Sequence, residues 1–188
     1  MAFGFRPISH RNGAPYNGAA NRYFISSGLN QALFVGDPVI MNSSGNTLGT
    51  LGDITIATAA AGNELLGIIV GFEPKRSDLT VKHSVAQVEG IALVADDPDL
   101  VFEVMEDSDS ENMVAADIKN LGIAIAAAGN TTSGASGWQL DSSDFSSTTT
   151  NAQYQLLGIK DDPGNALGTN AIWRVAINPN QHYFGTGQ

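Results

Sequence analysis

The chain has 188 residues, a net charge of −10 at pH 7 and no cysteine, so disulfide bonds and thiolate metal sites are excluded. Nucleic-acid binding depends on neutralising many phosphates, and the chain has only nine Lys and Arg residues, so we expect no nucleic-acid partner. No apolar run approaches the roughly 20 residues that cross a bilayer, and the first residues lack the apolar core of a signal peptide. We therefore expect a soluble protein that is made in the cytoplasm and has no membrane partner.

The first 20 residues show neither helical nor strand periodicity, and they contain Phe3, Phe5, Tyr16 and two Asn-Gly pairs. Disordered tails are typically poor in aromatic residues. The pattern therefore favours an extended N-terminal arm over residues 1–20, without regular structure of its own, that becomes ordered on a partner. An ordinary frayed terminus is the alternative.

Basic and acidic residues are separated along the chain. Residues 1–36 contain Arg6, Arg11 and Arg22 and no acid, whereas residues 89–111 contain nine acids and no base. A cationic arm and an anionic band on one small protein favour docking of one copy onto another, or docking onto a larger host surface. A solvated acidic face beside a flexible tail is the alternative.

Short apolar and β-branched runs, separated by clusters of Gly, Asn, Ser and Pro, recur along the chain and are typical of strands. The runs lie at residues 21–26, 29–35, 39–41, 54–58, 65–72, 88–95, 100–105, 123–127, 138–140, 153–160 and 171–177. The expected fold class is mainly β, with an antiparallel β-barrel or sandwich-like core. We expect this β-rich body to span residues 21–178 and an aperiodic C-terminal tail to span residues 179–188.

The acidic stretch from Gly90 to Asn112 predicts a β-hairpin followed by a short helix. The sequence Asp96–Asp99, with proline at position 98, suits a tight turn that would pair residues 88–95 with residues 100–105. Ser108, Asp109 and Ser110 can each cap a helix, and Glu111 completes a capping box with Ser108.

We place the only helix at residues 112–120. Val114, Ile118 and Leu121 fall at i, i+4 and i+7 of this segment and should face the core.

Two short motifs occur twice. Leu65–Ile68 reads LLGI, as does Leu156–Ile159, and the DDPD turn at residues 96–99 is followed by a DDPG turn at residues 161–164. This repetition indicates two related β lobes, at residues 21–106 and 122–178, joined by the helix at 112–120. A single barrel is the alternative.

Enzyme and metal sites find little support in the sequence. His10, His83 and His182 lack the spacing of a zinc-binding helix. The candidate metal ligands are Asp107, Asp109 and Glu111, which have the alternate spacing that begins a calcium loop. The loop lacks the later glycine and glutamate of an EF-hand. Helix capping explains these acids better, so we expect no catalytic residue, no metal and no cofactor.

The order of several motifs resembles head decoration proteins, also called capsid cement proteins, of tailed bacteriophages. The motifs are GFRPISHRNGAPYNG near the start, LLGIIVGFEP, VADDPDLVFEVMEDS before a short Ala-rich segment, and LLGIKDDPGNALGTNAIWRVAIN. They are structural motifs that cover most of the chain and carry no chemistry. The resemblance implies a mainly β protein, often a homotrimer, that binds the major capsid protein on the outer surface of the virion and stabilises the shell.

Under this resemblance the N-terminal arm lies across neighbouring capsid subunits. Phe3, Phe5 and Tyr16 would be apolar anchors, and Arg6 and Arg11 would pair with shell carboxylates. Deletion of residues 1–18 should then leave a folded protein that no longer binds shells.

Two other classes of function stay open. A carbohydrate- or receptor-binding β module would need exposed aromatic side chains, and Trp138 and Trp173 are the only tryptophans. A metal-dependent hydrolase would need histidines and carboxylates that converge in the fold.

Overall fold

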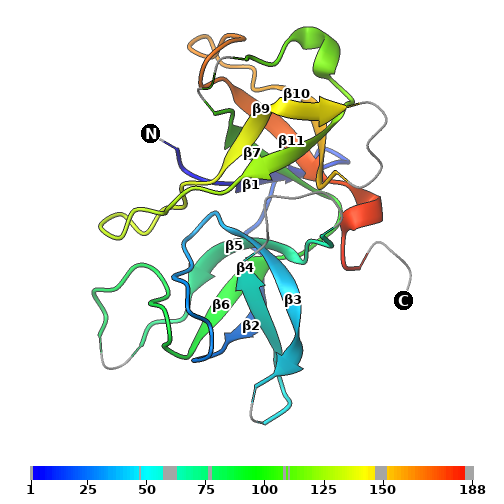
Figure 1. The fold of residues 1–188 in the computed structure, drawn as a ribbon. Helices are drawn as coiled ribbons and strands as arrows, with labels where there is room; N and C mark the ends of the chain where they lie inside the picture. Colours follow the sequence, from blue (N-terminus) through cyan, green and yellow to red (C-terminus); the bar gives the residue numbers. More distant parts are fainter. Residues whose placement is uncertain are drawn as a thin grey trace.

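The computed structural model describes residues 2–46, 48–56, 63–75, 78–107, 109, 111–146 and 152–184. Within these residues the chain forms a five-stranded mixed β-barrel and a six-stranded antiparallel sheet, which lie one above the other in Figure 1. The same residues contain no α-helix and two 3-10 helices, Ala115–Asp117 and Pro179–Gln181. The expected mainly β fold is therefore confirmed.

The barrel contains the second to sixth strands and forms the first lobe. Its strands are β2 (Asn21–Ile25), β3 (Pro38–Gly45), β4 (Gly52–Ile56), β5 (Gly67–Phe72) and β6 (Gly90–Ala95), and their order is β2-β4-β3-β5-β6. Apolar side chains from these strands, from the loop between β2 and β3 and from the residue before β5 fill the barrel; they include Tyr23, Ile25, Leu33, Val39, Ile54, Leu66, Ile69, Ala92 and Val94. The expected strand at residues 54–58 is present to Ile56, and its last two residues lie outside the described part.

The remaining strands form the second lobe. They are β1 (Arg6–His10), β7 (Leu100–Met105), β8 (Leu121–Ile125), β9 (Gln139–Ser146), β10 (Tyr154–Ile159) and β11 (Ile172–Ile177), in the order β1-β7-β11-β10-β8-β9. The hairpin around the DDPG turn is present, because β10 and β11 pair from Tyr154–Ile177 to Ile159–Trp173.

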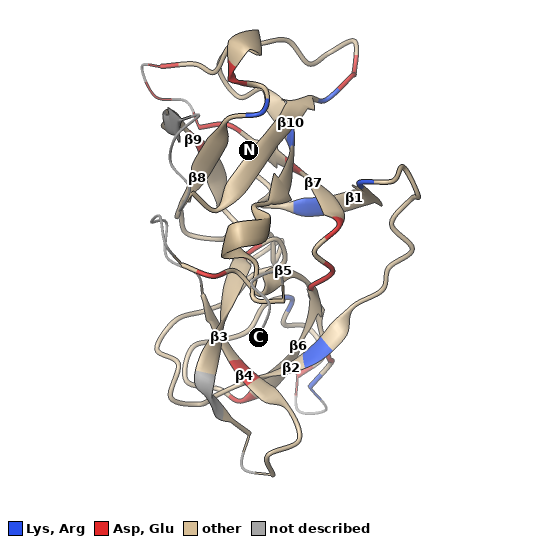
Figure 2. Cartoon of the chain, turned by 90° about the vertical axis from the view of Figure 1, so that its right-hand side faces the viewer, with Lys and Arg blue, Asp and Glu red and all other residues tan. Residues whose placement is uncertain are grey.

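The expected hairpin of residues 88–95 and 100–105 is not formed. β6 pairs with β2 and β5 in the barrel, whereas β7 pairs with β1 and β11 in the other sheet. The acidic connection 96–99 therefore links the lobes, and Figure 2 shows it as the red segment below β7. The division between the lobes lies at this connection and not at residues 106–122, because β7 finds its pairing partners in strands distant in sequence.

The two lobes share one strand arrangement. Followed around the barrel from β2, the strands come in the order first, third, second, fourth and fifth. The second lobe has the same order when it is followed from β7 through β9, β8 and β10 to β11. In the barrel the first and third strands are parallel, through Phe24 and Asp53. In the sheet a parallel bridge joins Glu106, directly after β7, to Leu140 of β9. All other neighbouring strands in both sets are antiparallel, which supports two related lobes.

The LLGI repetition does not mark the equivalent positions of the two lobes. In the fourth strand of each lobe the pairing register shifts next to a glycine, between Ile69 and Gly71 in β5 and between Leu156 and Gly158 in β10. Residues 69–72 of β5 therefore correspond to residues 156–159 of β10. The first LLGI motif, at residues 65–68, therefore lies four residues before the segment that corresponds to the second motif.

The expected helix at residues 112–120 is reduced to the 3-10 helix Ala115–Asp117. The Asp117 carboxylate accepts a hydrogen bond from the Val114 amide at 2.7 Å. The segment cannot continue as a helix because Lys119 and Asn120 already exchange backbone hydrogen bonds with Leu156 of β10. Val114 and Ile118 are exposed and do not face the core. The predicted caps Ser108 and Ser110 lie outside the described residues.

The lobes share a continuous apolar core. Leu65, Ile68 and Ala95 of the barrel belong to the same buried cluster as Tyr154 and Trp173 of the sheet. The segment after β11 adds to this contact, because Leu65 donates to the Gln181 carbonyl at 2.7 Å and accepts from the Tyr183 amide at 2.9 Å. The described part of the expected aperiodic tail, residues 179–184, is thus held against the barrel by backbone hydrogen bonds.

Among the described residues, no helix has the length and apolar character needed to span a membrane.

Candidate functional site

The expected N-terminal arm is part of the second lobe. Residues 6–10 form β1, which pairs with β7 from Arg6–Glu103 to His10–Leu100. Phe5 is 2% exposed, and its ring stacks on Tyr154 with centroids 4.5 Å apart. The segment therefore has regular structure without a partner, and deletion of residues 1–18 would remove an edge strand and a core side chain together.

The two predicted arm arginines are engaged within the chain. Arg6 donates to the Glu103 carboxylate at 2.6 Å, and its guanidinium lies 5.1 Å from the centre of the Phe3 ring. Arg11 donates to the Gln155 side chain at 3.0 Å and to the Ile177 carbonyl at 3.1 Å. Arg11 thus ties the segment to β10 and β11, while Arg6 is half-exposed beside a buried carboxylate.

Four of the five predicted arm residues line one groove. Phe3, Phe5, Arg6 and Tyr16 lie around it, and Arg11 lies elsewhere. The groove has a volume of about 310 Å³, and its other wall comes from both lobes: Pro7, Val35, Ile69, Val70 and Ala135. We call this surface the N-terminal groove. Its mostly aliphatic and aromatic walls suit an apolar side chain of a partner, with the Arg6 guanidinium available at the rim.

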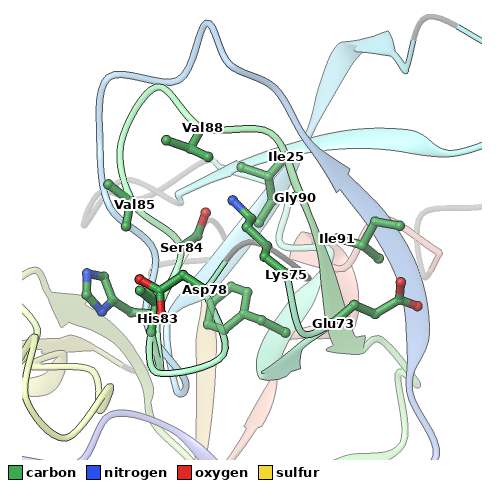
Figure 3. Close-up of a pocket in the computed structure, with 12 residues that line it drawn as sticks. Ile25, Glu73, Lys75, Asp78, His83, Ser84, Val85, Val88, Gly90 and Ile91 are labelled. Atoms are coloured by element: carbon green, nitrogen blue, oxygen red, sulfur yellow. The ribbon is translucent and has the colours of Figure 1, made fainter.

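A second pocket lies beside β5 and β6 and was not predicted from the sequence. Figure 3 shows the Lys75 amine and the Ser84 hydroxyl directed toward the same space, next to Ile25 and Val88. Burial lowers the pKa of Lys75, and the Ser84 hydroxyl is buried with no hydrogen-bond partner among the described residues. The only sequence signal was the cluster of basic residues between positions 75 and 83.

This pocket has a volume of about 180 Å³. Its polar lining residues are Glu73, Lys75, Asp78, His83 and Ser84, and the rest of its wall is mostly aliphatic.

Of the three predicted candidate metal ligands, two carboxylates lie close together and the third does not join them. Asp107 and Asp109 converge with Asp141, each offering a carboxylate oxygen within 4.8 Å of the others. The Ser142 hydroxyl lies 2.6 Å from Asp107, 2.9 Å from Asp109 and 3.0 Å from the Glu111 carbonyl. Glu111 thus contributes its backbone in place of its carboxylate. The spacing of acids in the sequence could not reveal Asp141. The Asp107 amide donates to the Leu140 carbonyl at 2.9 Å, and this contact between distant segments brings Asp107 next to Asp141.

The nine acids of residues 89–111 do not form one exposed band. Asp96, Glu103 and Glu106 are buried. Asp96 accepts from the Tyr23 hydroxyl at 2.5 Å, and the Glu106 carboxylate accepts from the Trp173 indole at 2.8 Å. These acids have structural partners inside the chain, which leaves a smaller acidic surface than the sequence suggested.

Glu106 should make stability depend on pH. Burial raises its pKa from 4.5 to about 6, the Trp173 hydrogen bond opposes this shift, and the Asp107 charge adds to it. Because the folded-state pKa is raised, the neutral form stabilises the fold, and that stabilisation is lost as pH rises from 4.5 through 6. We expect the variant Glu106→Gln to be more stable than the natural protein at pH 7 by about 1–2 kcal/mol.

Urea unfolding at pH 4.5 and pH 7 measures this effect, with the exposed residue Glu64 changed to Gln as the matched control. Parallel pH profiles for Glu106→Gln and the natural protein would contradict it.

The three histidines do not converge. His10 lies 3.5 Å from the Asp97 carboxylate, His83 stacks on Phe34, and His182 is buried beside Phe184. In the described part of the chain, the one group of three residues able to share a metal ion consists of aspartates alone.

No protein-family model and no curated protein matches this chain.

Proposed function

We propose that the chain is a virion structural protein that binds the outer surface of a phage capsid and stabilises the shell. The resemblance of its motifs to capsid cement proteins motivates the proposal. The observation that carries it is the N-terminal groove, where Phe3, Phe5, Arg6 and Tyr16 surround an apolar hollow that both lobes help to build. A pre-formed groove binds without the cost of ordering a free arm.

The proposed partner is the major capsid protein, and the proposed assembly is a homotrimer. An apolar side chain of a shell subunit would enter the groove, and a shell carboxylate would reach Arg6 at its rim. Repetition of this contact over the shell would convert a modest single affinity into stable decoration.

The alternative of a carbohydrate-binding module gains no support from the tryptophans. Trp138 is 1% exposed and Trp173 is fully buried, so neither provides a surface on which a sugar ring could stack.

The groove is tested with the variant Phe3→Ala. Phe3 lines the groove but is not part of the buried core, so we expect an unchanged melting temperature and a roughly tenfold lower affinity for shells. Co-sedimentation with shells assembled from the major capsid protein of the same phage measures the affinity, and sedimentation equilibrium measures the oligomeric state.

The variant Phe184→Ala is the matched control, because Phe184 is exposed and lies outside the groove. Equal loss of binding in both variants would argue against the groove, and failure of the natural protein to bind shells would overturn the proposed function.

A further inference from the structure

The pocket beside β5 and β6 contains two polar donors that the described part of the chain leaves without acceptors. Ser84 is 3% exposed, and its hydroxyl makes no hydrogen bond to the described residues. The Lys75 amine makes no hydrogen bond or ion pair with these residues either, and burial lowers its pKa against the opposing charge of Glu89. Both groups are directed toward the same space (Figure 3). A ligand that supplies acceptor oxygens there would relieve two unsatisfied donors at once.

The fold positions both donors. Ser84 exchanges two backbone hydrogen bonds with Leu33, at 2.8 and 3.0 Å, and these bonds fix the place of its hydroxyl. The Lys75 side chain lies along Gly90 of β6, where a Cβ atom would come within 3.3 Å of Lys75 Cε and 3.4 Å of Lys75 Nζ. The donors are therefore in place before a ligand arrives, which limits the entropic cost of binding.

Two carboxylates line the same pocket, and both have partners of their own. Glu73 accepts from Arg22 through both carboxylate oxygens, at 2.6 and 3.0 Å, and in Figure 3 it points away from the Lys75 amine. Asp78 accepts from the amide and the hydroxyl of Thr80, at 2.9 and 2.7 Å. The polar groups that are left to bind a ligand are thus an amine and a hydroxyl, and this pair favours an anion with two oxygens.

The rest of the wall is mostly apolar and sets the size and the character of the ligand. Its apolar side chains come from β2, β5, β6 and the loop between β5 and β6: Ile25, Phe72, Val81, Val85, Val88 and Ile91. The three valines are exposed at the rim, so an apolar group that covered them would be stabilised by leaving water. The pocket volume is about 180 Å³. Since an apolar cavity of about 150 Å³ holds a benzene ring, this pocket has room for a ring of that size and a carboxylate.

We propose that this pocket binds a small organic acid in which a carboxylate is attached to an apolar body of benzene size. The carboxylate accepts from Lys75 and Ser84, and the apolar body lies against the valines. This inference goes beyond the proposed function and does not depend on it, because the pocket shares no lining residue with the N-terminal groove.

Titration calorimetry of the natural protein with benzoate at pH 7 tests the proposal. We expect one saturable site with a dissociation constant of about 1 mM or lower. The uncharged analogue benzamide has nearly the same shape and should bind at least tenfold more weakly. Lack of saturation by benzoate, or equal affinity for benzamide, would overturn the inference. Backbone NMR shifts should change at Ser84 and Gly90, and changes confined to the N-terminal groove would also overturn it.

Substitutions in the pocket provide a second test. We expect Lys75→Met to weaken benzoate binding at least tenfold, while the matched control Lys82→Met, which removes an exposed charge outside the pocket, leaves it unchanged. Ser84→Ala keeps the backbone bonds to Leu33 and should weaken binding roughly fivefold. Equal binding by folded Lys75→Met and Lys82→Met variants would overturn the inference. If Lys75→Met does not fold, unchanged binding by Ser84→Ala would overturn it.

Discussion

Replacing Phe5 with alanine is expected to lower the free energy of unfolding by about 3–5 kcal/mol, the range for removing a buried phenylalanine. Phe5 is 2% exposed and stacks on Tyr154 at 4.5 Å with an angle of 13° between the rings. Its amide donates to the Gly36 carbonyl of the first lobe at 3.0 Å. Loss of the ring would leave a cavity between the N-terminal segment and the core of the second lobe.

Chemical denaturation of Phe5→Ala beside Phe3→Ala measures this difference. Both changes remove a phenyl ring from the same segment, but only Phe5 belongs to the buried core. We expect Phe3→Ala to stay within about 1 kcal/mol of the natural protein. Equal stability of the two variants would mean that the segment is detached from the core in solution, as the sequence had suggested.

Most of the strands were predictable because they have a local signal. β5 and β11 are runs of β-branched and aromatic residues bounded by turn residues, and their positions follow from composition alone. Pairing was less predictable. β6 and β7 flank a good turn sequence, yet they enter different sheets, and this choice depends on partner strands as distant in sequence as Arg6 is from Glu103, a separation of 97 residues.

β1 escaped prediction for a physical reason. Its residues are mostly half-buried with no alternation, Pro7 cannot donate a ladder hydrogen bond, and the pairing register shifts between Pro7 and Ser9. No period of two can arise from such a strand. Its position is fixed from outside, by the free side of β7 and by the pocket that receives Phe5.

The candidate sites, like the strand pairing, could be predicted from the sequence only in part. The N-terminal groove could be anticipated through its aromatic residues, but its other wall comes from Val35, Ile69 and Ala135, which only the fold brings there. Asp141 joined the acidic group only because Glu106 pairs with Leu140 of β9. Local chemistry can be predicted from sequence, whereas convergence between distant segments requires the topology.

The variant Gly4→Ala is expected to lower the free energy of unfolding by roughly 2–5 kcal/mol. Gly4 has φ +71°, a left-handed conformation that costs other residues energy, and a Cβ atom there would clash with Ser136 Cβ and lie 2.7 Å from the Gly36 carbonyl oxygen. The carbonyl belongs to the backbone and cannot move aside as a flexible side chain would. The lobes would therefore have to separate locally.

Gly13→Ala is the matched control that separates strain from crowding. Gly13 has φ +87°, but a Cβ atom there would meet nothing within 4 Å. This variant should lose only the conformational component, about 1 kcal/mol. Urea unfolding of both variants measures the difference, which reports how tightly the N-terminal segment is held between residues 36 and 136. Equal losses would mean that the contact at Gly4 relaxes freely, and the N-terminal groove would then lack the rigid wall on which the proposed shell contact depends.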